Sequence, residues 1–310
     1  MNNTEWAVGR TACEKDDIAL LNQAISTTAE SNLESFYEHL RRTAIKETAI
    51  EVLNALAERG VNFEHLRPLD IVGNRKVTKE TLDFLLAHGW DINYRETKGL
   101  DGNAQPFMWH CVDDHDTVAW CLEHDANVRP RGQEPLSKDV ITHSQRTCPQ
   151  ILERVATSGS VATFELLRSK GAPLGWRPLH LAVENATYGS ADLPDSEKDK
   201  AKAQRLRAER EERVEMVRHL IDKVKIDVNA PDQPAGSDVP GNYNGTPICY
   251  IPGSQMLERD TRELTWLLLD RGADPTPAIE VAKACDYPKF IEDVEAWRAQ
   301  ENNGQRCCVQ

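Results

Sequence analysis

The sequence contains no long apolar run and no basic leader. No stretch approaches the about 18 uncharged apolar residues that a membrane-spanning helix needs. The first residues, Met-Asn-Asn-Thr-Glu-Trp-Ala-Val, show no basic segment followed by an apolar one, so the sequence predicts no secretory signal. Both absences favour a location in the cytoplasm or the nucleus.

Positive charge is also scarce. The 310 residues include 37 Lys and Arg against 50 Asp and Glu, which gives a formal net charge of −13 at pH 7. Because such a surface repels phosphate backbones, we expect no nucleic acid partner. It favours instead a partner protein with a basic patch. Arg129 and Arg131 are the best candidates for a local basic patch, and we interpret them as solvated loop residues.

Patterns that carry chemistry are missing. The eight cysteines are scattered, without the paired Cys and His spacing of a zinc site, so we expect free thiols and neither metal nor other cofactor. There is no glycine-rich phosphate loop and no nucleophile elbow. One local group of titratable side chains exists, made of His110, Cys111, Asp113, Asp114 and His115. On a helix His110 and Asp114 would share a face and His115 would be rotated away, so we interpret the group as structural and predict no enzyme.

What the sequence does contain is a recurring helix ending. A leucine-bearing segment ends in glycine, which permits the left-handed conformation in which a chain leaves a helix. Asp125 holds the glycine position once, because Asp tolerates this conformation better than most residues. His88 and His124 stand at the same position just before two of these endings. The segments are 51–60, 81–89, 117–125, 163–171, 214–227 and 264–272.

Helix openings lie between these endings. Each places a proline in or next to the first turn, where its missing N–H is not needed. In the clearest opening, Gly175-Trp176-Arg177-Pro178-Leu179-His180, we expect the His180 ring to bond back to the turn before the helix. The others are Arg67-Pro68-Leu69-Asp70, Gln105-Pro106-Phe107-Met108 and Gly245-Thr246-Pro247-Ile248.

The pairing of such an opening with such an ending resembles the ankyrin repeat, whose period is about 33 residues. The resemblance covers roughly residues 43–297 and is clearest over 175–230 and 245–297. It implies an all-α fold, an α-solenoid of helix-turn-helix repeats with short hairpin or loop fingers. It also implies a protein–protein interaction adaptor or scaffold, which binds its partner on the concave repeat surface and is not an enzyme.

The same pattern divides the chain. We expect an N-terminal helical cap over 1–42, with one or two helices in 15–42, followed by about six degenerate repeats over 43–276. Capping helices over 277–300 and a flexible tail over 301–310 complete the chain. The oligomeric state is left open.

Two insertions interrupt the repeats, 187–213 and 231–246. From Asp195 to Arg213 there are six acidic and seven basic side chains, a composition that favours helix, so we expect the second helix of that repeat to be extended backward. Glu209 and Arg213 form a favourable i, i+4 pair there. The alternatives for this helix are a solvated element and a dedicated docking arm. Residues 231–246 are rich in Pro, Gly, Asn and Asp and predict a long loop.

We expect the partner on the fingers and first helices, whose outward positions do no packing. Trp, Tyr and Arg are the residues that dominate interface energies. The alternative for each aromatic side chain is packing against the adjacent finger. The candidates are Trp90, Asp91, Tyr94, Arg95, Trp109, Asp113, Asn127, Arg129, Trp176, Glu184, Asn185 and Tyr243.

Two other functions remain open. The last residues, Cys307-Cys308-Val309-Gln310, have the Cys-a-a-X form of a farnesylation site at Cys307, which would make the protein a scaffold tethered at a membrane. No polybasic run precedes it, and one lipid chain gives only reversible attachment. The other is an enzyme or small-molecule binder with a pocket under loop 231–246, which titratable side chains near His110 or Asp113 would favour.

Overall fold

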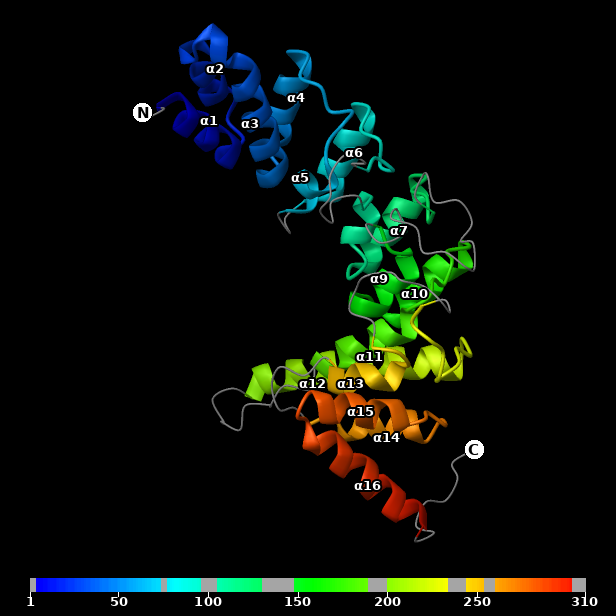
Figure 1. Ribbon diagram of the computed structural model, residues 1–310. Coiled ribbons are helices and arrows are strands. Elements are labelled where there is room, and N and C mark those ends of the chain that lie inside the picture. The colour runs from blue at the N-terminus through cyan, green and yellow to red at the C-terminus, as the bar shows by residue number, and fades with distance from the viewer. Residues whose placement is uncertain are drawn as a thin grey trace. The chain divides into compact units, whose positions relative to one another are not determined.

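Figure 1 shows the computed structural model of the chain, in which contacts define two compact units, 1–131 and 132–310. The structure describes residues 4–73, 77–95, 105–129, 148–188, 200–233, 244–253 and 260–302. Within these residues every regular element is a helix, which confirms the all-α prediction.

The N-terminal unit is a series of helix pairs. Within it the first helix of each pair contacts the first helix of the next, in the order α1, α3, α5 and η2. Each pair therefore completes its core with side chains from its neighbour. The elements are α1 (Thr4–Lys15), α2 (Ile18–Thr27), η1 (Glu30–Asn32), α3 (Leu33–Glu47), α4 (Ile50–Glu58), α5 (Pro68–Val72), α6 (Lys79–Ala87), η2 (Phe107–His110) and α7 (His115–Glu123).

The start of this unit differs from the sequence prediction. Helices α2 and α3 fill the region 15–42 as expected, but α3 runs on to Glu47, so the boundary expected after residue 42 falls inside a helix. Helix α1 was not predicted. Its buried face consists of the small residues Gly9, Ala12 and Cys13, which leave no large apolar periodicity in the sequence. Small side chains let α1 approach α3 closely.

The C-terminal unit repeats the arrangement. Its first helices α9, α11, α13 with η4, and α15 contact one another in that order. The helix pair expected over 277–297 is present as the last two helices. The elements are α9 (Ile151–Ser158), α10 (Val161–Ser169), α11 (Pro178–Tyr188), α12 (Lys200–Asp222), η4 (Pro247–Cys249), α13 (Tyr250–Gly253), α14 (Arg262–Leu269), α15 (Thr276–Ala284) and α16 (Pro288–Asn302).

Helix α12 confirms the predicted backward extension, since it starts at Lys200. The i, i+4 pair expected between Glu209 and Arg213 is not the one that forms. Glu209 pairs instead with Arg205 at 3.5 Å, while Arg213 donates to the Asn185 carbonyl of α11 at 3.5 Å. An acceptor on a neighbouring helix thus replaces the local partner.

The helix endings follow the prediction closely. Gly60, Gly89, Gly171 and Gly272 have φ between 80° and 88°, and Asp125 has φ 63°. All five lie in the left-handed region, which lets the chain leave the helix and turn back. In the segment 214–227 the left-handed residue is Lys225, because α12 already ends at Asp222.

The helix starts reveal a further internal repetition. The side chains of Thr78, Asp114 and Ser160 each cap a second helix by accepting from the backbone N–H of a threonine three residues on. Such a cap satisfies an N–H that the helix itself leaves without a partner. The threonines are Thr81, Thr117 and Thr163.

The cores are built from the helix faces that meet between pairs. In the first unit Phe36, Leu40 and Leu53 are fully buried, and in the second Phe164, Leu179 and Leu268 are. Burying one such side chain contributes roughly 1.5–3 kcal/mol. The structure thus shows an all-helical, repeat-like series of pairs.

Candidate partner-binding surface

The fingers, which run from the end of a second helix to the start of the next first helix, are tied to one another by asparagines. In the first unit the Asn93 amide donates to the Asp125 carbonyl at 3.0 Å and accepts from the Asn127 N–H at 2.7 Å. In the second unit Asn229 makes the same two bonds, to the Gly272 carbonyl at 2.9 Å and from the Asp274 N–H at 2.8 Å.

These two ties join equivalent positions. Asp125 and Gly272 are both left-handed residues that end a second helix. Each asparagine also follows an aspartate that accepts its backbone N–H at 2.9 Å, Asp91 for Asn93 and Asp227 for Asn229. This turn fixes the asparagine before it reaches the next finger. These hydrogen bonds therefore fix neighbouring fingers relative to one another, and with them the outward-facing residues of each finger.

His180 holds a finger as well, though not the expected one. Its Nε2 lies 3.0 Å from the Ala230 carbonyl, on the finger after α12, and its Nδ1 makes no hydrogen bond to the turn before its own helix. Burial lowers the pKa of His180 to about 4, so the ring is neutral at pH 7 and Nε2–H donates this bond. The reason for the difference is packing: α11 lies against α12, whose finger returns across the start of α11.

A buried carboxylate fixes the finger that carries Trp176. Glu153 of α9 accepts from the backbone N–H groups of Trp176 at 2.7 Å, Arg177 at 2.8 Å and Gln150 at 3.3 Å. Burial raises the pKa of Glu153, and these three donors act in the opposite direction. Gly175 has φ 78°, and a Cβ there would lie 2.5 Å from the Glu153 carboxyl carbon. Only glycine fits between the carboxylate and this turn.

The same polar chain continues to the ends of loop 231–246. Arg177 donates to the Tyr250 hydroxyl at 3.0 Å, and that hydroxyl donates to Asp232 at 2.8 Å. Asp232 also accepts from the Gly245 N–H at 2.9 Å, which joins the two ends of the loop. Residues 234–243, and with them the candidate Tyr243, lie outside the described residues.

The prediction is wrong for two of the contact residues, because their side chains are buried. Trp109 is fully buried and Trp90 is 4 % exposed, so neither side chain faces a partner. Trp90 follows the left-handed Gly89, and its ring turns inward to meet Phe107 edge-on at 5.2 Å between ring centres. Both tryptophans belong to the core of the first unit, and Trp90 packs on η2, a first helix.

The other candidates of the first unit lie at its surface. Asp113, Asn127 and Arg129 are exposed, and Asp91, Tyr94 and Arg95 are half-buried. The side chains of Asp91 and Asn127 accept backbone N–H groups of their own turns. In the second unit Trp176, Glu184 and Asn185 are half-buried. Their role in partner binding remains a prediction.

The group around His110 does not form one helical face. The short helix η2 ends at His110, the chain turns, and Asp114 becomes the N-cap of α7. A hydrogen bond from the Thr117 hydroxyl lowers the pKa of Asp114, a carboxylate engaged in capping. In the described residues no set of His, Cys, Asp and Glu is placed to hold a metal ion.

Three thiols of the first unit, Cys13, Cys111 and Cys121, are poor nucleophiles. Burial raises the pKa of Cys13 and of Cys121 to about 12, and it raises the pKa of Cys111 as well. A thiol in this state holds little reactive thiolate near pH 7. Cys307, the candidate lipid acceptor, lies outside the described residues.

A polar cleft of about 340 Å³ opens between α3 and the finger after α4. The Arg41 guanidinium donates to the Asn62 carbonyl, and Arg59 donates to Asn22 at 2.6 Å, so both cations are held by the protein itself. Neither His110 nor Asp113 lines this cleft. Its lining is Glu34, Tyr37, Glu38, Arg41, Arg59, Gly60, Val61 and Asn62.

No protein-family model matches the sequence, and no curated protein matches it. Among the described helices none is long and apolar enough to cross a bilayer. The repeat-like architecture is therefore recognised from the succession of helix pairs and from the hydrogen bonds between fingers.

Proposed function

We propose that the chain is an ankyrin-type adaptor, which binds a partner protein on its fingers and first helices and carries out no catalysis. The observation that carries this proposal is the pair of equivalent asparagine ties at Asn93 and Asn229. A surface fixed in advance loses little conformational entropy when a partner binds, and this favours recognition.

The contact residues are chosen among those candidates whose side chains are at least partly exposed. In the first unit we assign Tyr94, Arg95 and Arg129, and in the second Trp176 and Glu184. Tyr, Trp and Arg are the types that contribute most to interface energies, and the acid Glu184 suits a basic patch on the partner. The net charge of −13 favours a basic patch on the partner and, in this proposal, a location in the cytoplasm or nucleus.

The test is affinity capture from native lysate, quantified by mass spectrometry. The finger variant Tyr94→Ala/Trp176→Ala is compared with wild type and with Ile18→Ala/Arg168→Ala, which removes exposed side chains from α2 and α10. We expect proteins that wild type and control retain and that the finger variant loses. Identical recovery by all three, with circular dichroism confirming folding, would refute the assignment of this surface.

A lipid-tethered form of the same adaptor is the second candidate, favoured by the ending Cys307-Cys308-Val309-Gln310. Farnesylation would remove the last three residues and leave Cys307 as the modified terminus. The intact mass of protein purified from its native cells decides this: an unprocessed Gln310 end excludes it. No observation in the described residues favours a pocket under loop 231–246.

A further inference from the structure

The polar cleft of the first unit lies on the surface proposed for partner binding, because it opens between the first helix α3 and the finger after α4. The finger contributes residues 59–62 to one wall. The other wall is a single face of α3, whose lining residues follow one another at helical spacing. They are Glu34, Tyr37, Glu38 and Arg41. A volume of about 340 Å³ is small for a ligand site and suits one side chain of a partner.

The two arginines of the cleft are bound to neutral oxygen atoms of the protein. The Arg41 guanidinium donates to the Asn62 carbonyl and so joins α3 to the finger. Arg59 donates to the Asn22 side chain of α2 at 2.6 Å and so joins the start of the finger to α2. The negative charge of Glu38 also acts on Arg41. Both cations therefore fix the walls of the cleft.

The free acid of the cleft lies toward the start of α3. Glu38 pairs with Arg42, whereas Glu34 is exposed and forms no hydrogen bond or ion pair with any described residue. At about 1.5 Å per residue, Glu34 lies about 10 Å from Arg41 along the helix axis. This is close to the Debye length of about 10 Å at about 0.1 M ionic strength. Salt therefore screens much of the repulsion between Arg41 and a cation bound at Glu34.

The remaining walls suit the apolar stem of a long basic side chain. Tyr37 and Val61 are both half-buried, one on each side of the cleft. The stems of lysine and arginine pack on apolar surface while their charged ends stay in water. An aromatic ring also attracts a cation that lies over its face. Glu34 stands in the first turn of α3, where an acid favours the helix dipole, but the dipole does not explain the cleft beside it.

We propose that this cleft receives a basic side chain, lysine or arginine, of the partner protein. The charge of that side chain binds Glu34, and its stem packs on Tyr37 and Val61. The net charge of −13 favours the approach of a cation. An acidic side chain would meet guanidinium groups that are already bound, and the same net charge would repel it. This inference rests on the proposed function, because it names what the partner brings to one part of that surface.

The test uses the isotope-labelled full-length chain and small probes, the N-acetyl methylamides of lysine, arginine, norleucine and glutamate. Amide chemical shifts measured by NMR report where each probe binds and how tightly. We expect the lysine and arginine probes to shift residues 34–41 and 59–62 and to saturate. Norleucine has an apolar stem without the charge, so it should bind the cleft about two- to fivefold more weakly, as the loss of one exposed ion pair implies.

Two variants separate the acid from the wall. Glu34→Gln is compared with Glu80→Gln, which removes an exposed acid from the same helix position, the second residue of α6. We expect the basic probes to bind about two- to fivefold more weakly to Glu34→Gln and to be unchanged by Glu80→Gln. Tyr37→Ala leaves the net charge unchanged and should also weaken binding by about two- to fivefold, because the aromatic wall is lost.

Three results would overturn the proposal: no saturable shifts in the cleft with either basic probe, tighter binding of glutamate than of both basic probes, or equal weakening in Glu34→Gln and Glu80→Gln. Circular dichroism checks that the variants fold, and the comparison with norleucine needs only wild type. A cleft that binds no basic probe, while Tyr94→Ala/Trp176→Ala still loses partners, would refute this inference alone. Binding of the basic probes together with identical recovery from lysate would refute only the finger assignment.

Discussion

At the scale of single residues, buried polar groups fix the fingers. Glu153 receives three backbone N–H groups, and the chain from Arg177 through Tyr250 to Asp232 joins residues far apart in the sequence. A buried polar group without partners costs about 1–3 kcal/mol, so each member depends on the others. The outer residues of a finger are placed by these inner ones.

Glycines 171 and 175 allow a matched comparison. Both are left-handed, but a Cβ at Gly171 meets nothing within 4 Å, whereas one at Gly175 meets the Glu153 carboxylate at 2.5 Å. We expect Gly171→Ala to lower the free energy of unfolding by about 1 kcal/mol, through backbone strain alone. Gly175→Ala should cost about 1–3 kcal/mol more, because the carboxylate must move.

Urea unfolding followed by circular dichroism measures both glycine variants. Equal losses for the two would show that Glu153 does not closely confine the turn at Gly175.

His180 gives a dependence of stability on pH. Its pKa is about 4 in the folded protein against an ordinary value of 6.5, so between these values the unfolded chain takes up a proton that the folded protein does not. The neutral His180 ring contributes its full stabilisation above pH 6.5. As the pH falls toward 4, the free energy of unfolding decreases by about 3 kcal/mol at most.

Unfolding free energies of wild type and His180→Asn, measured from pH 7 to pH 4, isolate this effect from the titration of carboxylates. Asparagine keeps a donor for Ala230 and does not titrate, so its curve should fall less steeply. Parallel curves would contradict the lowered pKa.

At the scale of elements, equivalent residues recur in neighbouring helices. His88 and His124 each place Nδ1 at 2.8 Å from the carbonyl four residues before, and each ring stacks on an aromatic of the previous turn. The sequence placed these histidines at one repeat position, and the structure confirms it. The N-terminal half of α12 (200–213) has no counterpart in the other described pairs. Its described side chains form ion pairs and are not part of the core.

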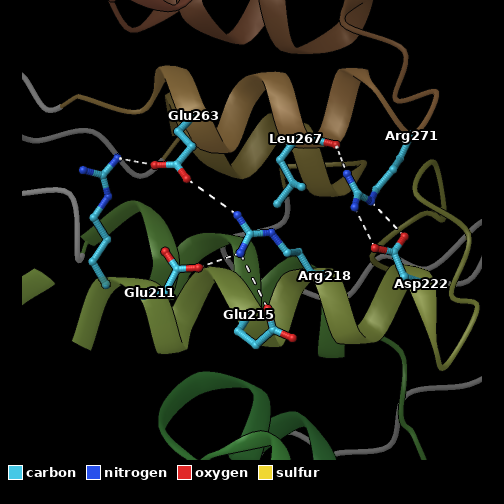
Figure 2. Close-up of polar contacts among 8 residues, drawn as sticks. Glu211, Glu215, Arg218, Asp222, Glu263, Leu267 and Arg271 are labelled. Atoms are coloured by element: carbon cyan, nitrogen blue, oxygen red, sulfur yellow. Dashed lines mark hydrogen bonds and ion pairs between the residues drawn. The ribbon is translucent and has the colours of Figure 1, made fainter. Parts of the chain in front are cut away.

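Glu263 is the acid of α14 that binds two arginines of α12 (Figure 2). We expect Glu263→Gln to raise hydrogen exchange over 204–213 by about two- to fivefold, since exposed ion pairs contribute about 0.2–1 kcal/mol each. Exchange over 214–222 should change little, because Val214, Met216, Val217 and Leu220 stay buried.

The control for this measurement is Glu215→Gln, which removes a carboxylate that contacts Arg218 from within α12. Equal exchange over 204–213 in both variants and in wild type would mean that the contact with α14 does not stabilise residues 204–213 of α12.

At the scale of the whole molecule, the chain forms two compact units, each with its own buried core. We expect the two units to unfold separately, so the unfolding free energies of the Gly171, Gly175 and His180 variants are those of the second unit. We expect Gly175→Ala to speed hydrogen exchange in α9 and α11 and to leave α1 to α4 unchanged. Faster exchange throughout would show that the chain unfolds as one cooperative body.

The sequence by itself determined the backbone pattern of this protein. Left-handed endings at Gly89 and Asp125 and proline in the first turns follow from local sterics and hydrogen bonding, which depend on a few neighbouring residues. The all-helical class was implied by the resemblance of this pattern to a helical repeat, and the structure confirms it. Helix α1 was not predicted, because its buried face is made of small side chains, whose packing depends on α3.

Only the tertiary structure decided which side chains face outward. Trp90 and Trp109 are of a residue type that dominates interfaces, yet both are buried. His180 bonds to Ala230 and not to the turn before its own helix. Burial and hydrogen-bond partners depend on segments that meet across 23 to 73 positions, as Glu153 with Trp176 and Arg177 with Tyr250 do. No local rule encodes those distances, because neighbouring pairs set them when they pack.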